Sequence, residues 1–119
     1  MIINVVNSSN LNFNAEVSPR FVKSMQGYFN NGSNRKQNIY KLNEKIKEYS
    51  EFGKDNYLIE MIQKSGPLGY EYWLVATRTD EPTAREIVLA VRTAYRKIVN
   101  KFMNMKKGEF LSHFRGVRD

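Results

Sequence analysis

The sequence predicts a small α+β fold that forms a single domain over residues 1–119. Two amphipathic segments come first, two strand-like segments joined by a turn follow, and a longer amphipathic segment comes last. A chain of 119 residues corresponds to one domain, and a hydrophobic fraction of 41 % is enough to fill one core. The predicted order is therefore an N-terminal strand, two helices, an antiparallel β-hairpin and a long C-terminal helix.

The N-terminal part of the chain predicts a strand, a loop and the start of a helix. Residues 1–6 are apolar and β-branched, which is typical of an edge strand, and residues 7–14 form a polar loop from which Phe13 packs into the core. Ser18 and Pro19 then favour a helix start, because serine caps a helix and proline lacks an N–H that would be unpaired there.

The first helix covers residues 18–30, and a second begins at Asn34, with Ser33 as its cap, and ends near Gly53. One face of the second helix is apolar, and its other positions carry charged pairs three and four residues apart, which are typical of a solvated surface. The apolar stripe consists of Ile39, Leu42, Ile46 and Tyr49.

Residues 57–64 and 70–77 predict a β-hairpin around the turn 66–69. Proline at the second turn position and glycine at the fourth favour a tight reversal. The register that makes one face apolar and the other mixed pairs Ser65 with Tyr70, Lys64 with Glu71, Met61 with Leu74 and Ile59 with Ala76. A helix over residues 56–64 also fits the spacing, but the β-rich partner segment favours the hairpin.

The longest amphipathic pattern predicts a C-terminal helix over residues 83–105, which Pro82 opens after a cap at Asp80 or Glu81. Its apolar stripe consists of Ala84, Val88, Val91, Tyr95, Ile98 and Phe102. A second stripe consists of Arg85, Arg92 and Arg96, flanked by Lys97 and Lys101. Three apolar residues outside the first stripe predict a homodimer contact, and they are Leu89, Val99 and Met103. The tail from residue 109 onward packs back as a short element.

Positive charge is concentrated near the C-terminus. The chain has a net charge of +7, but residues 1–84 hold ten basic against nine acidic residues, whereas residues 85–119 hold nine against three. Clustered positive charge attracts polyanions. A nucleic acid is the favoured partner, while an anionic protein surface or a role in solubility alone are the alternatives. The expected contact residues in this region are Arg85, Arg92, Arg96, Lys97, Lys101, Lys106 and Lys107.

Several functional classes find no support in the sequence. The chain has no cysteine, so disulfides and thiolate chemistry are excluded. The longest apolar run, residues 87–91, is far too short to span a bilayer, and the N-terminus lacks a secretory pattern, so we expect a cytoplasmic protein without a membrane partner. His113 is the only histidine and no phosphate-binding loop is present, so we expect no enzymatic activity and no metal or other cofactor. Acid–base or magnesium chemistry at Glu60 and Glu71 stays open as an alternative.

The order helix, tight turn, helix and hairpin over residues 18–78 resembles a winged helix-turn-helix DNA-binding domain, and the motif Ser-Asn-Arg-Lys-Gln-Asn-Ile-Tyr-Lys-Leu at residues 33–42 carries the resemblance. The resemblance implies that the helix from Asn34 lies in the major groove and that the hairpin over residues 57–77 forms the wing. The expected DNA contacts are Arg35, Lys36, Gln37, Asn38 and Lys41. A polar first turn on a surface helix is the structural alternative for these residues.

The same elements also fit a ferredoxin-like sandwich, in which residues 109–117 add a final strand. In that fold Tyr70, Tyr72 and Trp73 could stack single-stranded bases, or simply pack in the core.

Together these patterns predict a non-enzymatic nucleic-acid-binding protein that favours duplex DNA and acts in regulation, replication or DNA transfer. Thirteen asparagines indicate an A/T-rich gene and favour a phage or plasmid of a bacterial host. The alternatives are a phage-encoded inhibitor that binds an acidic host protein or nucleoprotein, and a binder of single-stranded nucleic acid.

Overall fold

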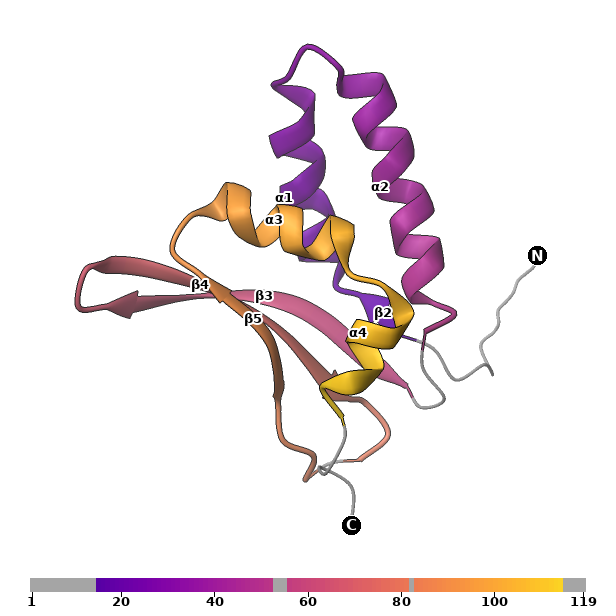
Figure 1. Cartoon of the computed structure of the whole chain (residues 1–119), viewed down its shortest axis with the longest axis vertical. Helices are drawn as coiled ribbons and strands as arrows, with labels where there is room; N and C mark the ends of the chain where they lie inside the picture. The colour runs from indigo at the N-terminus through magenta and orange to yellow at the C-terminus, as the bar shows by residue number, and fades with distance from the viewer. Residues whose placement is uncertain (1–14, 53–55, 82, 115–119) are drawn as a thin grey trace.

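A computed structural model describes residues 15–52, 56–81 and 83–114 and confirms the α+β class (Figure 1). The N-terminal strand over residues 1–6, the loop over residues 7–14 with Phe13, and the helix stop at Gly53 lie outside the described residues. The elements are β2 (Ala15–Val17), α1 (Pro19–Asn30), α2 (Arg35–Tyr49), β3 (Tyr57–Gly66), β4 (Gly69–Arg78), β5 (Ile87–Arg92), α3 (Tyr95–Asn104) and α4 (Lys107–Ser112).

The strands form a four-stranded mixed sheet in the order β2-β3-β4-β5. β2 runs parallel to β3, and the other two pairings are antiparallel. The predicted hairpin is confirmed in its register, which pairs Ser65 with Tyr70, Lys64 with Glu71, Met61 with Leu74 and Ile59 with Ala76. Pro67 and Leu68 form the turn, and Gly69 follows it with a φ of 121°, which residues with a side chain rarely adopt.

The helices pack on one face of this sheet and build the core there (Figure 1). Alternation along the strands puts Ile59, Leu74 and Ala76 on the core face, where they are fully buried. Phe21 of α1 meets Phe102 of α3 edge to face, with ring centroids 5.3 Å apart. The core therefore lies between the sheet and the layer of helices.

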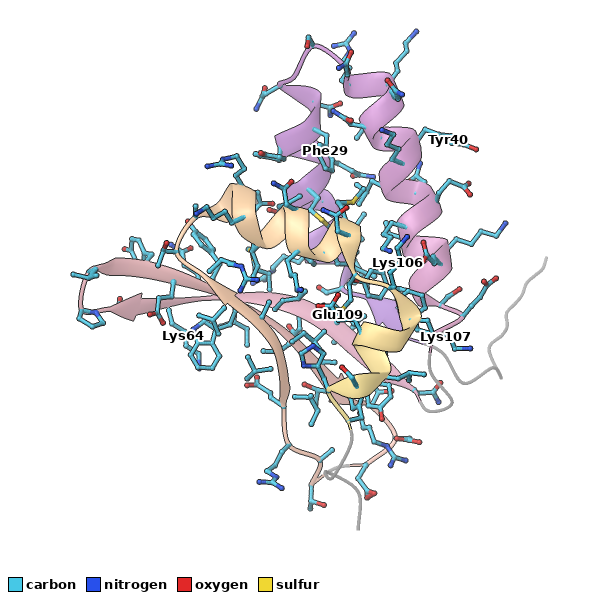
Figure 2. All side chains as sticks on the ribbon, in the orientation of Figure 1. Phe29, Tyr40, Lys64, Lys106, Lys107 and Glu109 are labelled. Atoms are coloured by element: carbon cyan, nitrogen blue, oxygen red, sulfur yellow. The ribbon has the colours of Figure 1, made fainter. Side chains whose placement is uncertain are left out.

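The other face of the sheet carries a separate row of side chains. Val75 is fully buried but lies outside the core cluster, because it points to this second face. Next to it, the Lys64 ammonium lies 4.0 Å from the centroid of the Trp73 ring, and the Trp73 indole N–H donates to Glu71 at 3.2 Å. Lys64 is labelled on the projecting hairpin in Figure 2.

The prediction of one continuous helix over residues 83–105 is wrong. Ile87–Arg92 forms β5, which pairs with β4, and the helix begins only at Tyr95. A short apolar run fits a buried strand as well as a helix by spacing alone, and its β-branched residues favour the strand once a partner edge is present. The predicted apolar stripe is therefore divided among three segments. Ala84 precedes β5, Val88 and Val91 lie on β5, and the other three residues lie on α3.

The three residues from which a homodimer contact was predicted belong to the core and are not an exposed surface, while the homodimer itself stays a prediction. Leu89 is 3 % exposed and Val99 is fully buried. Met103 is half-buried and packs against the core cluster. None of these three residues offers an exposed apolar surface.

Several finer predictions differ from the structure. Lys107–Ser112 is helix α4, so the final strand expected over residues 109–117 is not present within the described residues. The central position of β3 and β4 in a four-stranded sheet differs from the two-stranded wing that the resemblance implies. Asn34, not Ser33, occupies the N-cap of α2, and neither Asn34 nor Ser18 makes a side-chain capping hydrogen bond.

Candidate nucleic-acid interface

Helix α3 presents a polar face to solvent because its apolar face is buried in the core. Ile98, Val99 and Phe102 are fully buried. With 3.6 residues per turn, the opposite side of the helix points away from the sheet. This outward side carries Arg96, Lys97, Asn100, Lys101 and Asn104, of which only Lys101 is half-buried.

The position of α3 is fixed by contacts with the two preceding helices. The Tyr49 hydroxyl of α2 donates to the carbonyl oxygen of Phe102 at 2.8 Å. The buried Lys45 ammonium, also on α2, donates to the carbonyl oxygen of Met105, just after α3 ends. At the other end of α3, the hydroxyls of Tyr95 and of Ser24 on α1 lie 2.5 Å apart. The polar face is thus supported along the whole helix.

Six cationic side chains gather on α3 and its two flanks, and we call this set the α3 basic face. Within residues 15–52, 56–81 and 83–114, one ion pair involves the set, between Lys101 and Glu109. Figure 2 shows Lys106 and Lys107 at the junction of α3 and α4, with Glu109 on α4. The α3 basic face consists of Arg92, Arg96, Lys97, Lys101, Lys106 and Lys107.

The first turns of α2 lie at a different place in the molecule. Arg35, Lys36, Gln37 and Lys41 are exposed and Asn38 is half-buried, as expected for a surface helix. They lie at the projecting end of the α1–α2 helix pair (Figure 1). Lys45, where α2 meets the end of α3, is ten residues further along, a rise of about 15 Å. The structure therefore separates the two predicted groups of contact residues.

Arg85 does not belong to the α3 basic face, so the predicted stripe of three arginines is wrong. Arg85 lies in the connection that precedes β5, whereas Arg92 ends that strand. A six-residue strand spans about 20 Å, and β5 therefore separates the two residues. Arg92 and Arg96 are four residues apart along the chain, because α3 begins only three residues after β5 ends.

Two polar residues of the α3 surface were missed in the sequence analysis. Asn100 and Asn104 are exposed on α3, and with Arg96 they follow a spacing of four residues. The Asn104 amide nitrogen donates to the carbonyl oxygen of Asn100 at 2.8 Å. The signal in the sequence is the spacing of four residues, which places both asparagines on the same side of a helix as Arg96.

The three aromatic residues expected to stack bases are divided between the two faces of the sheet. Tyr70 and Tyr72 lie on the core face, where Tyr70 is exposed, whereas Tyr72 is half-buried and packs against the core cluster and the Tyr95 ring. Trp73 lies on the opposite face, under the Lys64 ammonium. A single platform made of all three residues is therefore not formed.

Glu60 and Glu71, named for the alternative acid–base chemistry, are separated along the hairpin. Glu60 is opposite Val75 and Glu71 is opposite Lys64, so the two carboxylates lie about 14 Å apart along the hairpin. No group of three or more His, Cys, Asp or Glu side chains in the described ranges could hold a metal ion. No helix in the same ranges is long and apolar enough to cross a membrane.

Comparison of the chain with family models, curated proteins and solved structures finds no match. The support for a function therefore comes from the placement and chemistry of the α3 basic face.

Proposed function

We propose that this protein is a non-enzymatic nucleic-acid-binding protein that binds duplex DNA through the α3 basic face. One observation carries the proposal: six cationic side chains gather on one helix and its flanks, and only Lys101 is paired with a carboxylate within the described residues. A directed cluster of this kind attracts a polyanion, whereas scattered cations mainly promote solubility.

The dimensions and chemistry of α3 support duplex DNA as the partner. Its ten residues give a length of about 15 Å, and a major groove about 12 Å wide admits a helix. Arginine and asparagine are the side chains that form paired hydrogen bonds with guanine and adenine. We assign base contacts to Arg96, Asn100 and Asn104, and phosphate contacts to the lysines that flank them.

The projecting end of the α1–α2 pair supplies a second, smaller group of cations. Arg35 and Lys36 are exposed there and, within the described residues, form no ion pair. We propose that they contact phosphates on a neighbouring part of the duplex. Because they lie apart from α3, their loss should weaken binding less than loss of the α3 cations.

The biological setting that we propose follows from composition. The asparagine-rich sequence supports an origin in a phage or plasmid and an activity in the bacterial cytoplasm, in regulation, replication or DNA transfer. The winged helix-turn-helix resemblance is compatible with this setting, but the α3 basic face does not depend on it.

A salt-dependent binding titration tests the proposal. About five phosphate contacts should give a slope of about −4.5 when the logarithm of the binding constant for a duplex is plotted against the logarithm of salt concentration. Replacing Arg96 and Lys97 with alanine should lower duplex affinity about tenfold and reduce the slope by about one, because Lys97 is assigned to a phosphate and Arg96 to a base. The matched control replaces Arg85 and Lys47 with alanine, which removes the same charge elsewhere and should leave the affinity nearly unchanged.

The proposal would be overturned by a duplex affinity that does not depend on salt or by an absence of duplex binding at low salt. An equal loss of duplex affinity in the two double variants would also overturn it. The inhibitor alternative makes a different prediction. It expects nuclease-treated host lysate to yield an acidic protein that binds the wild type in stoichiometric amounts and is lost with the Arg96 and Lys97 variant.

A further inference from the structure

The β3–β4 hairpin extends past the helices, and its uncovered end carries aromatic and polar side chains on the core face (Figure 1). Tyr72 is opposite Gln63 on one side and Arg92 on the other, so the three side chains form a row across the sheet. Tyr70 is opposite Ser65 in the next row of this face and is 61 % exposed. Tyr72 is half-buried against the core cluster, and Tyr70 continues the same face toward the exposed end of the hairpin.

Two helical tyrosines border this uncovered surface. The rings of Tyr72 and Tyr95 meet edge to face with centroids 5.7 Å apart, and those of Tyr95 and Tyr28 do so at 5.3 Å. Tyr28 is itself 37 % exposed. We call the resulting surface the aromatic shelf, which consists of Tyr28, Tyr70, Tyr72, Arg92 and Tyr95.

The charge around the aromatic shelf is positive. Arg92 belongs to it, and Arg96 follows Tyr95 directly on α3. The carboxylates of the hairpin strands, Glu60 and Glu71, alternate to the opposite face, where Glu71 accepts the Trp73 indole N–H. The shelf therefore combines the exposed rings of Tyr28 and Tyr70 and two half-buried rings with the guanidinium group of Arg92, without a carboxylate from either hairpin strand.

We infer that the aromatic shelf binds unpaired bases of a nucleic-acid strand, which continues from the duplex held on α3. Exposed aromatic rings stack bases of any sequence, and neighbouring cations neutralise the phosphates of the same strand. Tyr95 of the shelf is the first residue of α3 and directly precedes Arg96, so the shelf begins where the proposed duplex contacts of α3 begin. This inference rests on the proposed function and specifies its substrate as a duplex with a single-stranded extension.

Tyr70 is the residue best suited to test the shelf. It is 61 % exposed, so its replacement should leave the fold intact. Tyr40 is a matched control, because it is 65 % exposed but lies on α2, away from the hairpin (Figure 2). The variants are Tyr70→Ala, Tyr70→Phe, which keeps the ring, and Tyr40→Ala.

The experiment is a fluorescence anisotropy titration with three labelled probes: a blunt duplex, the same duplex with a ten-nucleotide single-stranded extension, and the single strand alone. We expect the wild type to bind the extended duplex about tenfold more tightly than the blunt one, the effect of one base–aromatic stack. Tyr70→Ala should remove this advantage and keep blunt-duplex affinity, while Tyr70→Phe and Tyr40→Ala should retain it. A 2-aminopurine base in the extension should lose fluorescence on binding the wild type, because stacking quenches it.

Equal binding of blunt and extended duplexes by the wild type would overturn the inference and leave the proposed function standing. An equal effect of Tyr70→Ala on both duplexes would also overturn it. Tyr70-dependent binding of the single strand without binding of the blunt duplex would support the shelf and contradict the proposed duplex function. Tyr70-dependent binding of a polyglutamate peptide in place of every nucleic-acid probe would contradict both.

Discussion

The ring of Tyr49 on α2 stacks on the ring of Phe102 on α3, with centroids 4.5 Å apart and planes inclined by 13°. The Tyr49 hydroxyl also donates to the Phe102 carbonyl oxygen at 2.8 Å. That carbonyl lies in the last turn of α3, where helical carbonyls lack partners within the helix. One side chain thus both packs α3 against the core and satisfies one of the carbonyl groups in its last turn.

Replacement of Tyr49 with phenylalanine should destabilise the protein while retaining the stacked rings. The Phe102 carbonyl oxygen loses its buried donor, which should lower the free energy of unfolding by about 1–2 kcal/mol. Urea denaturation followed by circular dichroism measures this change. An unfolding free energy equal to that of the wild type would show that the hydroxyl does not stabilise α3.

Stability should fall at alkaline pH because of the same tyrosine. Burial raises the pKa of Tyr49 well above its usual value, and the negative charges of Glu109 and Glu48 raise it further. Burial also raises the pKa of Tyr95. A folded-state pKa above the unfolded one gives stability that is complete below about pH 10 and declines as the pH rises further. Unfolding measured from pH 8 to 11 should show a steeper decline for the wild type than for Tyr49→Phe, and parallel curves would contradict the assignment.

The Lys97→Glu substitution should separate stability from binding. Lys97 lies in the first turn of α3, where the helix dipole favours an acidic side chain. The free energy of unfolding should therefore rise by about 0.3–1 kcal/mol, whereas duplex affinity should fall because a cation of the α3 basic face becomes an anion. Thermal denaturation and a binding titration on the same sample measure both effects. Unchanged duplex affinity would contradict the assignment of Lys97 to binding, and a loss of stability would contradict the dipole argument.

Replacement of Lys64 with methionine should lower stability and leave duplex affinity unchanged, the reverse of Lys97→Glu. The Lys64 ammonium lies over the Trp73 ring on the sheet face opposite the helices, so its loss should lower the free energy of unfolding by about 0.5–1 kcal/mol. Duplex affinity should stay unchanged, although the chain loses one positive charge. Lys47→Met, on the exposed surface of α2, is the control for the loss of charge alone. A clear loss of duplex affinity in Lys64→Met but not in Lys47→Met would place the nucleic acid on the sheet face opposite the helices and contradict the proposal.

Much of the fold was predictable because its signals are local. The hairpin register could be derived from the two-residue alternation and the turn at Pro67, and every predicted pair agrees with the structure. The first helix could be derived from Pro19 and the spacing of apolar residues after it. β5 could not be predicted in the same way, because residues 87–91 satisfy a helix and a strand equally well when taken alone.

The candidate interface was predictable only in part for the same reason. The grouping of Arg96, Lys97 and Lys101 depends on helical spacing over one continuous turn and is retained on α3. The grouping of Arg85 with Arg92 required a helix that extends across residues 87–91, and it disappears when that segment is a strand. The approach of Tyr95 to Tyr28 and Tyr72 involves three elements distant in sequence, and no local pattern indicates it.

Local patterning was therefore sufficient for the first two helices, the hairpin and the excess of C-terminal cations, because each depends on residues close together along the chain. Only packing in three dimensions settled the state of residues 87–92, since the edge of β4 provides the hydrogen bonds that make a strand more stable than a helix there. Because residues 87–92 form a strand, α3 begins only at Tyr95. The position of α3 then determines which cations it carries and brings Tyr95 to Tyr28 and Tyr72.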